Sequence, residues 1–362
     1  MNLDPALFQE NQRTAPSESG RRYEPVGELS CEAGGYLPDV TISYETWGEL
    51  NPARDNAVLI CHALSGDAHA IGWWERLIGP GKGIDTDHLF VIGHNVLGGC
   101  QGTTGPASPA PDGTPYGTRF PMVTIGDMVE AQRRLVTALG IEVLHGVAGG
   151  SMGGMMALEW SLRWPGSVRN VFMTASTAAH NAMQIGFNEA ARQAVMRDPK
   201  WQGGRYPLED PPRHGLAVAR MVGHLSYLSE ASFEAKFGRR LRDKEAFSYD
   251  FNPEFQVESY LSYQGDKFTS RFDPNSLLYL TRAMDYYSRT SLEGSMSRYL
   301  FTSFTSDWLY PSRQSARLHG MATEAGCRSA HHEIDLPYGH DAFLLDGEQQ
   351  GVVVRDLFLG SS

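Results

Sequence analysis

The hydrophobic positions near the two ends of the chain follow a pattern of short strands separated by helices. Residues 56–61 form a continuous apolar run, typical of a strand buried on both faces. Further strands are predicted at residues 89–93, 143–148, 168–173, 299–304 and 332–336, and helices at 125–139, 152–164 and 350–359. Residues 23–47 alternate apolar and polar positions, which favours an antiparallel start. The whole pattern predicts an α/β fold whose mostly parallel sheet is covered by helices on both faces.

Between these parts the strand signal is weak and helical spacing dominates. Helices are predicted at residues 185–196, 216–228, 255–263 and 276–287. We therefore expect an inserted helical lid at residues 179–297, and a core formed by residues 23–178 and 298–362. A helical insertion can cover a pocket and exclude water, and a role in dimerisation is compatible with that. The polar residues 1–22 predict a flexible N-terminal arm.

Composition and charge narrow the classes of function. The chain has 362 residues and a net charge of −11, which argues against a nucleic acid or an anionic membrane as partner. Its four scattered cysteines contain no C-x-x-C pair, which favours a reducing compartment and no metal site. The N-terminus lacks the apolar core of a signal peptide, and no apolar run approaches the roughly 18 residues of a membrane span. These features predict a cytoplasmic protein.

Residues 149–153, Gly-Gly-Ser-Met-Gly, match the G-x-S-x-G pattern of a nucleophile elbow. The pattern requires a strand before it and a helix after it, and both are predicted here. Glycine neighbours allow a turn so tight that Ser151 is held in a strained conformation at the start of a helix. Backbone N–H groups there favour a developing oxyanion. The pattern therefore predicts Ser151 as a nucleophile; the alternative is a tight turn that only packs well.

A nucleophilic serine needs a base and a carboxylate that orients the base. In proteins with a nucleophile elbow, the acid follows the serine along the chain and the histidine follows the acid. Asp307 follows one predicted strand, and His340 lies in the glycine-containing loop after the next. The carboxyl ends of parallel strands share one edge of a sheet, so both side chains are expected beside Ser151. Asp335 is a rival acid that we expect inside the last strand. His331 and His332 are expected at the wrong edge.

Two loops that follow predicted strands are expected near the serine. The loop at residues 62–66 follows a buried strand, so the backbone N–H of Leu64 is the candidate oxyanion donor beside that of Met152. We expect His62 to brace this loop and take no part in catalysis. The glycine-rich residues 95–106 lack the lysine of a P-loop and do not fit G-x-G-x-x-G. They are therefore expected to form a wall of the active site, not a nucleotide cradle.

Taken together, five segments of the chain resemble the homoserine O-acyltransferase family. They are residues 59–67, 95–106, 149–155, 255–261 and 338–343, and the likeness extends from about Tyr23 onward. The resemblance implies an α/β-hydrolase fold and acylation of the γ-hydroxyl of L-homoserine by an acyl-CoA, in methionine biosynthesis. It implies that Ser151 is the nucleophile, Asp307 the orienting acid and His340 the base.

The same resemblance implies that Arg220, Tyr227 and Asp341 bind homoserine. Arg220 and Tyr227 are seven positions apart on one predicted helix and share a face. An arginine can bind a carboxylate through two hydrogen bonds, and Asp341 can pair with an ammonium group. Without the resemblance, Arg220 would be interpreted as a solvated charge on the lid.

The expected reaction is ping-pong transfer through an acyl-serine, with acetyl-CoA as co-substrate and no tightly bound cofactor. The oligomeric state cannot be read from the sequence, and the resemblance implies a homodimer formed through the lid. Residues 102–106 resemble the acetyltransferase form, and no cation is evident near Thr103 or Ser151 for a succinyl carboxylate. Succinyl-CoA as donor and serine as acceptor stay open, as do a serine esterase and a non-catalytic binding protein. A basic cluster at Lys236, Arg239, Arg240 and Arg242 is interpreted as a solvated face rather than a CoA site.

Overall fold

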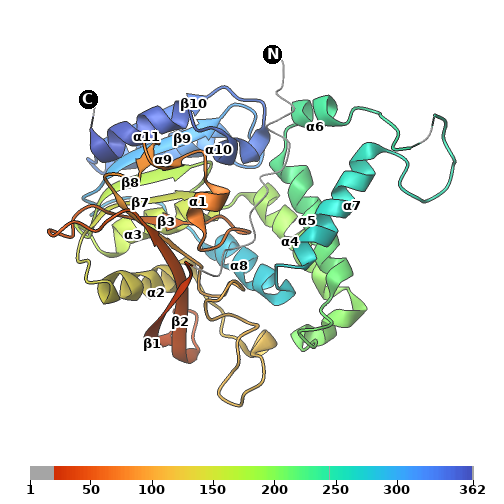
Figure 1. The fold of residues 1–362 in the computed structure, drawn as a ribbon, viewed down its shortest axis with the longest axis horizontal. Helices are drawn as coiled ribbons and strands as arrows, with labels where there is room; N and C mark the ends of the chain where they lie inside the picture. The colour runs from red at the N-terminus through yellow and green to blue at the C-terminus, as the bar shows by residue number, and fades with distance from the viewer. Residues whose placement is uncertain (1–19, 244, 361–362) are drawn as a thin grey trace.

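The computed structural model describes residues 20–243 and 245–360 and contains one large, mostly parallel sheet (Figure 1). Its strands lie in the order β1-β2-β6-β3-β7-β8-β9-β10, and only the pairings that involve β1 and β2 are antiparallel. The bounds are β1 Arg22–Ser30, β2 Tyr36–Trp47, β3 Ala57–Cys61, β6 Phe90–His94, β7 Leu144–Gly150, β8 Val168–Thr174, β9 Arg298–Phe304 and β10 Ser329–Ile334. A separate two-stranded sheet pairs β4 (Ile78–Gly79) with β5 (Ile84–Asp85). The predicted sheet with an antiparallel start is confirmed.

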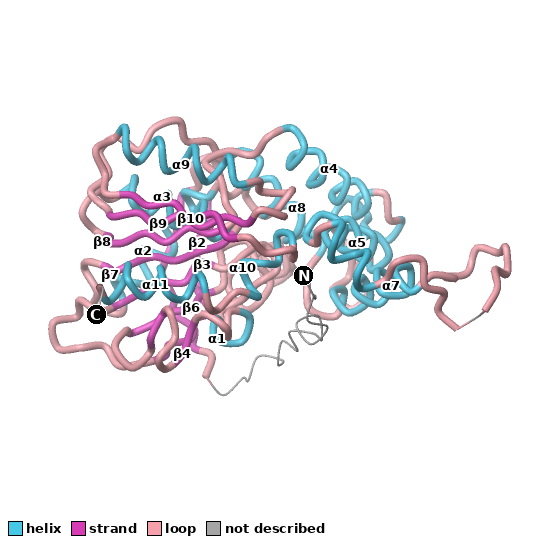
Figure 2. The backbone as a smooth tube through the Cα atoms, turned by 90° about the horizontal axis from the view of Figure 1, so that it is seen from above, coloured by secondary structure: helices cyan, strands magenta, loops and turns pink. Residues whose placement is uncertain are grey.

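Helices cover both faces of this sheet, as Figure 2 shows from above. One core contains residues of α2 (Ile125–Ala138), α3 (Met152–Arg163) and α9 (Ser312–Glu324), and the other contains residues of α1 (Ala70–Trp73), α10 (Ala342–Leu345) and α11 (Gln349–Leu359). Successive side chains of β3 alternate between the two: Leu59 and Cys61 belong to the first core, and Val58 and Ile60 to the second. A strand that must be apolar on both faces gives the continuous apolar run seen in the sequence.

Among the described residues, five α-helices follow β8 and precede β9, and they lie to one side of the sheet (Figure 1). They are α4 (Ala182–Met196), α5 (Arg213–Tyr227), α6 (Glu230–Lys236), α7 (Gln256–Thr269) and α8 (Pro274–Tyr286). The start of α4 is fixed by a capping box in which Asn181 and Gln184 bond each other's backbone N–H groups. Asp273 caps the start of α8, because its side chain accepts from Ser276 N, and a proline occupies the first turn.

The structure differs from the predicted elements at several boundaries. α7 continues six residues beyond the predicted end, because Gly265 lets it pack closely against Ala217 of α5. The last strand ends at Ile334, so Asp335 lies after the strand and not inside it. The sequence did not predict α6 or α9, and α9 buries few apolar side chains, chiefly Leu318 and Met321. β1 begins at Arg22, and most of the predicted N-terminal arm lies outside the described residues.

Among the described helices, none combines the length and apolar character of a membrane span.

Candidate active site

Ser151 lies at the turn between β7 and α3, in the conformation expected of a nucleophile elbow. Its φ of 56° and ψ of −123° are unusual for a residue with a side chain, and its N–H donates to the Thr174 carbonyl of the neighbouring strand at 3.1 Å. A Cβ at Gly153 would collide with the Cys61 carbonyl oxygen, and one at Gly149 with the backbone of Gly153. Both glycines are therefore required for the close approach of β3, β7 and α3.

Asp307 and His340 meet at the same edge of the sheet. Asp307 follows β9, and His340 lies in the short helix η4 (Gly339–Asp341) after β10. His340 Nδ1 is 2.8 Å from Asp307 Oδ2, and both residues are buried. Asp307 Oδ1 accepts the N–H groups of Leu309 and Tyr310 at 3.0 and 2.8 Å, which fixes the carboxylate. An ionised aspartate accepts only, so His340 Nδ1 carries the proton and Nε2 is left as the basic nitrogen.

The structure brings Ser151 and His340 to the same cavity, which has a volume of about 380 Å³. The rival Asp335 instead accepts a hydrogen bond from Thr305 Oγ1 at 2.7 Å. Asp335 follows the last strand and does not lie inside it as expected, but the carboxylate that contacts His340 is that of Asp307. His331 lies within β10, 2.8 Å from Ser303 Oγ.

The loop after β3 lies beside Ser151, and His62 braces it as expected. His62 Nδ1 is 2.7 Å from the Ala63 carbonyl, and its Nε2 accepts from Val96 N at 3.1 Å. Leu64 lines the cavity next to Ser151. Met152 is the first residue of α3, and N–H groups in the first turn of a helix have no partner within that helix. Leu64 thus lines the same two cavities as Ser151, and Met152 directly follows Ser151 in the chain, while their role as oxyanion donors stays a prediction.

The prediction that residues 95–106 form an active-site wall is wrong. None of these residues lines either of the two cavities beside Ser151. Thr103 Oγ1 instead accepts from Ser43 N at 2.9 Å and donates to the Asn95 carbonyl at 2.7 Å. The segment is thus hydrogen-bonded to β2 and to the residue after β6, and it supports the loop that contains His62. Because the segment does not line the cavities beside Ser151, the absence of a cation near Thr103 does not indicate which acyl group binds.

Arg220, Tyr227 and Asp341 line the same cavity as Ser151 and His340. The Arg220 guanidinium carbon is 5.7 Å from the Tyr227 ring centroid and 4.8 Å from that of Phe268. Arg220 Nε is buried and has no hydrogen-bond partner among the described residues. A buried, unsatisfied N–H of a cation is costly, so this site suits an anionic ligand group.

The sequence did not predict that several other residues lie at this site. Lys236 lines the cavity together with Lys267 and Arg271, whereas Arg239, Arg240 and Arg242 are exposed. The interpretation of the basic cluster as a solvated face therefore holds for the three arginines and fails for Lys236. Tyr310 was also missed, although it comes three residues after Asp307. Its ring stacks on His340 with centroids 4.8 Å apart.

No group of three or more His, Cys, Asp or Glu side chains in the described part of the chain could hold a metal ion.

Comparison with known proteins places this site in a family. The α/β hydrolase fold model matches residues 56–347. A homoserine O-acetyltransferase of Solidesulfovibrio magneticus is 50% identical over 364 residues, covering 93% of this chain and 92% of that protein. The crystal structure of homoserine O-acetyltransferase from Bacillus anthracis has a TM-score of 0.87 at 28% identity and covers 94% of this chain and 97% of that one. The structure of esterase E22 has a TM-score of 0.87 at 29% identity, covering 93% and 99%. The chain therefore belongs to the homoserine O-acetyltransferase family, within the α/β-hydrolase fold.

Proposed function

We propose that this acyltransferase moves the acetyl group of acetyl-CoA to the hydroxyl of L-homoserine through an acyl-serine, giving O-acetyl-L-homoserine for methionine biosynthesis. One observation carries the proposal. The cavity that contains Ser151 and His340 also contains Arg220, whose buried Nε lacks a partner among the described residues, and Asp341. A simple ester hydrolase needs the serine and histidine, but it has no need of a cation and an anion placed for an amino acid.

The first half-reaction uses Ser151, His340 and Asp307 as a catalytic triad. His340 Nε2 takes the Ser151 proton while Ser151 Oγ attacks the thioester carbonyl, and the N–H groups of Leu64 and Met152 hold the oxyanion. The C–S bond then breaks, His340 returns the proton to the sulfur, and CoA leaves with its thiol protonated. Asp307 stabilises the imidazolium that forms between the two steps.

The second half-reaction repeats these steps with homoserine. His340 removes the proton of the homoserine hydroxyl, whose oxygen attacks the acyl-serine carbonyl, and the proton returns to Ser151 Oγ as the ester is released. Arg220 binds the homoserine carboxylate beside the Tyr227 ring, and Asp341 binds the ammonium group. The helices α4 to α8 act as a lid, and exclusion of water favours transfer over hydrolysis.

A second, smaller cavity beside Ser151 supports acetyl as the acyl group. Its volume is about 60 Å³, and apolar side chains such as Phe187, Val222 and Met284 line it. No Lys or Arg is among its lining residues. A methyl group fits these surroundings, whereas the carboxylate of a succinyl group would be buried there without a cation.

The cations that line the larger cavity suit acetyl-CoA as the acyl donor, because CoA carries phosphate groups. Three cations from the lid line the larger cavity and are placed to attract the phosphates of CoA: Lys236, Lys267 and Arg271.

No tightly bound cofactor is required by this chemistry. The four cysteines are all unpaired, which suits a cytoplasmic protein, and we propose a homodimer on the basis of the family.

The direct test follows release of CoA thiol with acetyl-CoA or succinyl-CoA at equal concentration, each with homoserine or serine. We expect the highest rate for acetyl-CoA with homoserine, and little CoA release when homoserine is omitted. Faster turnover with succinyl-CoA would assign a succinyltransferase. Release of free acetate as fast without homoserine as with it would assign an esterase, the activity named for E22.

Arg220→Ala should lower kcat/KM for homoserine by about a hundredfold, because a hydrogen-bonded charge pair in a partly desolvated site is lost. The rate of CoA release in the first turnover, which precedes homoserine binding, should stay close to wild type. Arg213→Ala is the matched control, since Arg213 is an exposed residue at the start of the same helix. An equal loss in both half-reactions would show that Arg220 supports the lid and does not bind the acceptor.

A further inference from the structure

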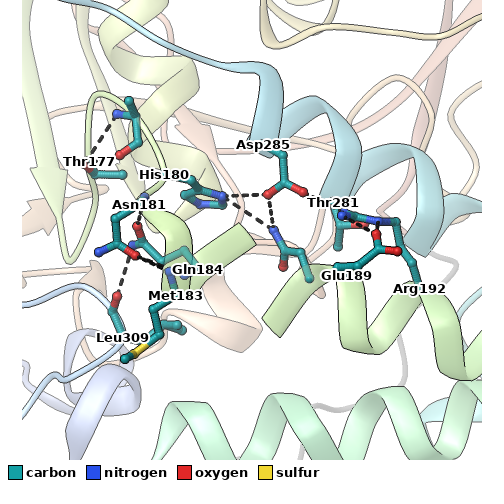
Figure 3. Close-up of polar contacts among 12 residues, drawn as sticks. Thr177, His180, Asn181, Met183, Gln184, Glu189, Arg192, Thr281, Asp285 and Leu309 are labelled. Atoms are coloured by element: carbon teal, nitrogen blue, oxygen red, sulfur yellow. Dashed lines mark hydrogen bonds and ion pairs between the residues drawn. The ribbon is translucent and has the colours of Figure 1, made fainter. Parts of the chain in front are cut away.

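Two turns next to Ser151 are held by different parts of the molecule. The turn after β9 is held from the lid, because Gln184 Nε2 of α4 donates to the Leu309 carbonyl at 3.0 Å (Figure 3). The turn at residues 63–66 follows β3, and all four of its residues line the cavity that contains the serine. The first peptide group of this second turn is held from the core, by the side chain of His62.

The Ala63 carbonyl oxygen has two close donors. Gly66 N donates to it at 2.8 Å and closes the turn, and His62 Nδ1 is 2.7 Å from the same oxygen. A carbonyl oxygen has two lone pairs, so these two contacts use its capacity to accept. A Cβ at Gly66 would lie 2.7 Å from His62 Cβ and 3.2 Å from its Nδ1. The glycine therefore leaves the room in which the imidazole lies against the turn.

The other ring nitrogen of His62 determines which nitrogen carries the proton. Nε2 accepts from Val96 N at 3.1 Å, and a backbone N–H can only donate. Asn95 Nδ2 lies 3.2 Å from the same Nε2, and Asn95 Oδ1 accepts from Gln101 N, which turns the amide nitrogen toward the imidazole. Because Nε2 faces two donors, it carries no proton. The ring proton is therefore on Nδ1, which donates it to the Ala63 carbonyl.

This hydrogen bond sets the direction of the Leu64 N–H. The Ala63 carbonyl and the Leu64 N–H belong to one planar, trans peptide group, in which the two point in opposite directions. Leu64 is the second residue of the turn, so its N–H takes no part in the bond that closes the turn. Among the described residues, Leu64 lines the cavity and His62 does not. A carbonyl held on the His62 side therefore turns the N–H away from His62.

We propose that His62 is a positioning residue for the oxyanion hole and acts through the Ala63–Leu64 peptide group. Its Nδ1–H holds the Ala63 carbonyl and keeps the Leu64 N–H aimed at the oxygen that becomes negative when Ser151 attacks the acyl group. The inference deepens the proposed function and rests on the roles given there to Ser151 and Leu64. His62 itself does not touch the reacting atoms. The glycine-rich residues 95–106 also gain a role, because they supply the two donors that keep the His62 proton on Nδ1.

Two variants of His62 separate the contributions of its two nitrogens. An asparagine side chain places its amide group near the position of histidine Nδ1, and a glutamine side chain near that of Nε2. His62→Gln can therefore still accept from Val96 N but loses the donor to the Ala63 carbonyl. His62→Asn can still donate to Ala63 but loses the acceptor for Val96.

His62→Gln should lower kcat by about thirtyfold, a part of the roughly hundred- to thousandfold contribution of one oxyanion donor. Both half-reactions pass through an oxyanion and should slow alike, so KM for acetyl-CoA and for homoserine should stay nearly unchanged. His62→Asn should keep kcat within about threefold of wild type, because the donor is retained, although its thermal stability should fall.

His145→Asn is the matched control. His145 lies on β7, and its Nε2 is also 2.7 Å from a backbone carbonyl, that of Phe358 in α11. The asparagine does not reach the Nε2 position, so this variant also loses an imidazole contact with a carbonyl, but one away from the oxyanion turn. We expect a loss of thermal stability with kcat close to wild type.

A small trifluoromethyl ketone gives a second readout, because addition of Ser151 Oγ to its carbonyl forms a stable tetrahedral oxyanion. Its inhibition constant should rise in His62→Gln by about the factor by which kcat falls. A purely structural role would lower stability without this rise. Wild-type kcat in His62→Gln, or equal losses of kcat in His62→Asn and His62→Gln, would overturn the inference. Failure of the wild-type protein to transfer acetyl groups to homoserine would instead overturn the proposed function.

Discussion

Ser151→Ala should lower the rate of acetyl transfer to homoserine by more than about a thousandfold. Removal of a nucleophile from a triad abolishes the covalent route and leaves only the contribution of binding and of the oxyanion donors. The loss should appear in kcat, because the alanine leaves Arg220 and Asp341, the residues proposed to bind the acceptor, in place. CoA release in the first turnover should vanish as well.

Ser161→Ala is the matched control for this change. Ser161 is a buried serine on the same helix, α3, and its hydroxyl donates to the Leu158 carbonyl. We expect near wild-type turnover from it, with at most a modest loss of stability. If Ser151→Ala kept more than a thousandth of the wild-type rate, acetyl transfer would not pass through this serine.

Asp307→Asn should lower kcat by about ten-thousandfold, with the fold retained. The asparagine oxygen can still accept the N–H groups of Leu309 and Tyr310, so the turn after β9 keeps its main-chain contacts. Its amide group, however, donates to His340 Nδ1 and places the imidazole proton on Nε2. That nitrogen can then no longer accept the proton of Ser151. Steady-state turnover and the rate at which a small fluorophosphonate labels Ser151 both measure the effect.

Asp335→Asn gives the comparison that decides between the two carboxylates. Asp335 also follows a strand at this edge of the sheet, but its partner is Thr305. We expect its turnover to stay within about twofold of wild type, as for a surface substitution that leaves the site intact. A large loss in Asp335→Asn together with an active Asp307→Asn would reverse the assignment of the orienting acid.

The sequence predicted the sheet, and it predicted that Ser151, Asp307 and His340 lie at one edge of it, because both depend on local signals with strong physical causes. β3 is apolar at every position, since its side chains enter two cores. The elbow needs glycines where α3 and its neighbouring strands meet, and these glycines flank Ser151 in the sequence. Asp307 and His340 could be found because parallel strands end at one edge.

The parts that could not be predicted depend on contacts between distant segments. β10 ends before Asp335, and no local pattern marks that end. A binding role for Arg220 is suggested only by its place in the cavity, where its Nε is buried and its guanidinium lies over the Phe268 ring. Tyr310 is an ordinary aromatic residue in the sequence, and only the fold brings its ring onto His340 and its hydroxyl to His180, which lies 130 positions away.

The resemblance of the fold to both an acetyltransferase and an esterase has a simple physical basis. The B. anthracis homoserine O-acetyltransferase and esterase E22 match this chain with the same TM-score, 0.87. One backbone that presents a serine, a histidine and an aspartate can serve both reactions if both pass through an acyl-enzyme, as proposed here. In the proposed function the acceptor is selected by the side chains of the cavity wall, Arg220 and Asp341.

The central claim is that Ser151 carries the acyl group, and mass spectrometry of the protein after brief exposure to acetyl-CoA tests it most directly. Without homoserine, we predict a peptide containing Ser151 that is acetylated on that residue, and addition of homoserine should remove the label at the rate of turnover. Ser151→Ala should give no such peptide. Formation of acetylated homoserine in a single turnover, with no acetyl group on Ser151 at any time, would contradict the account.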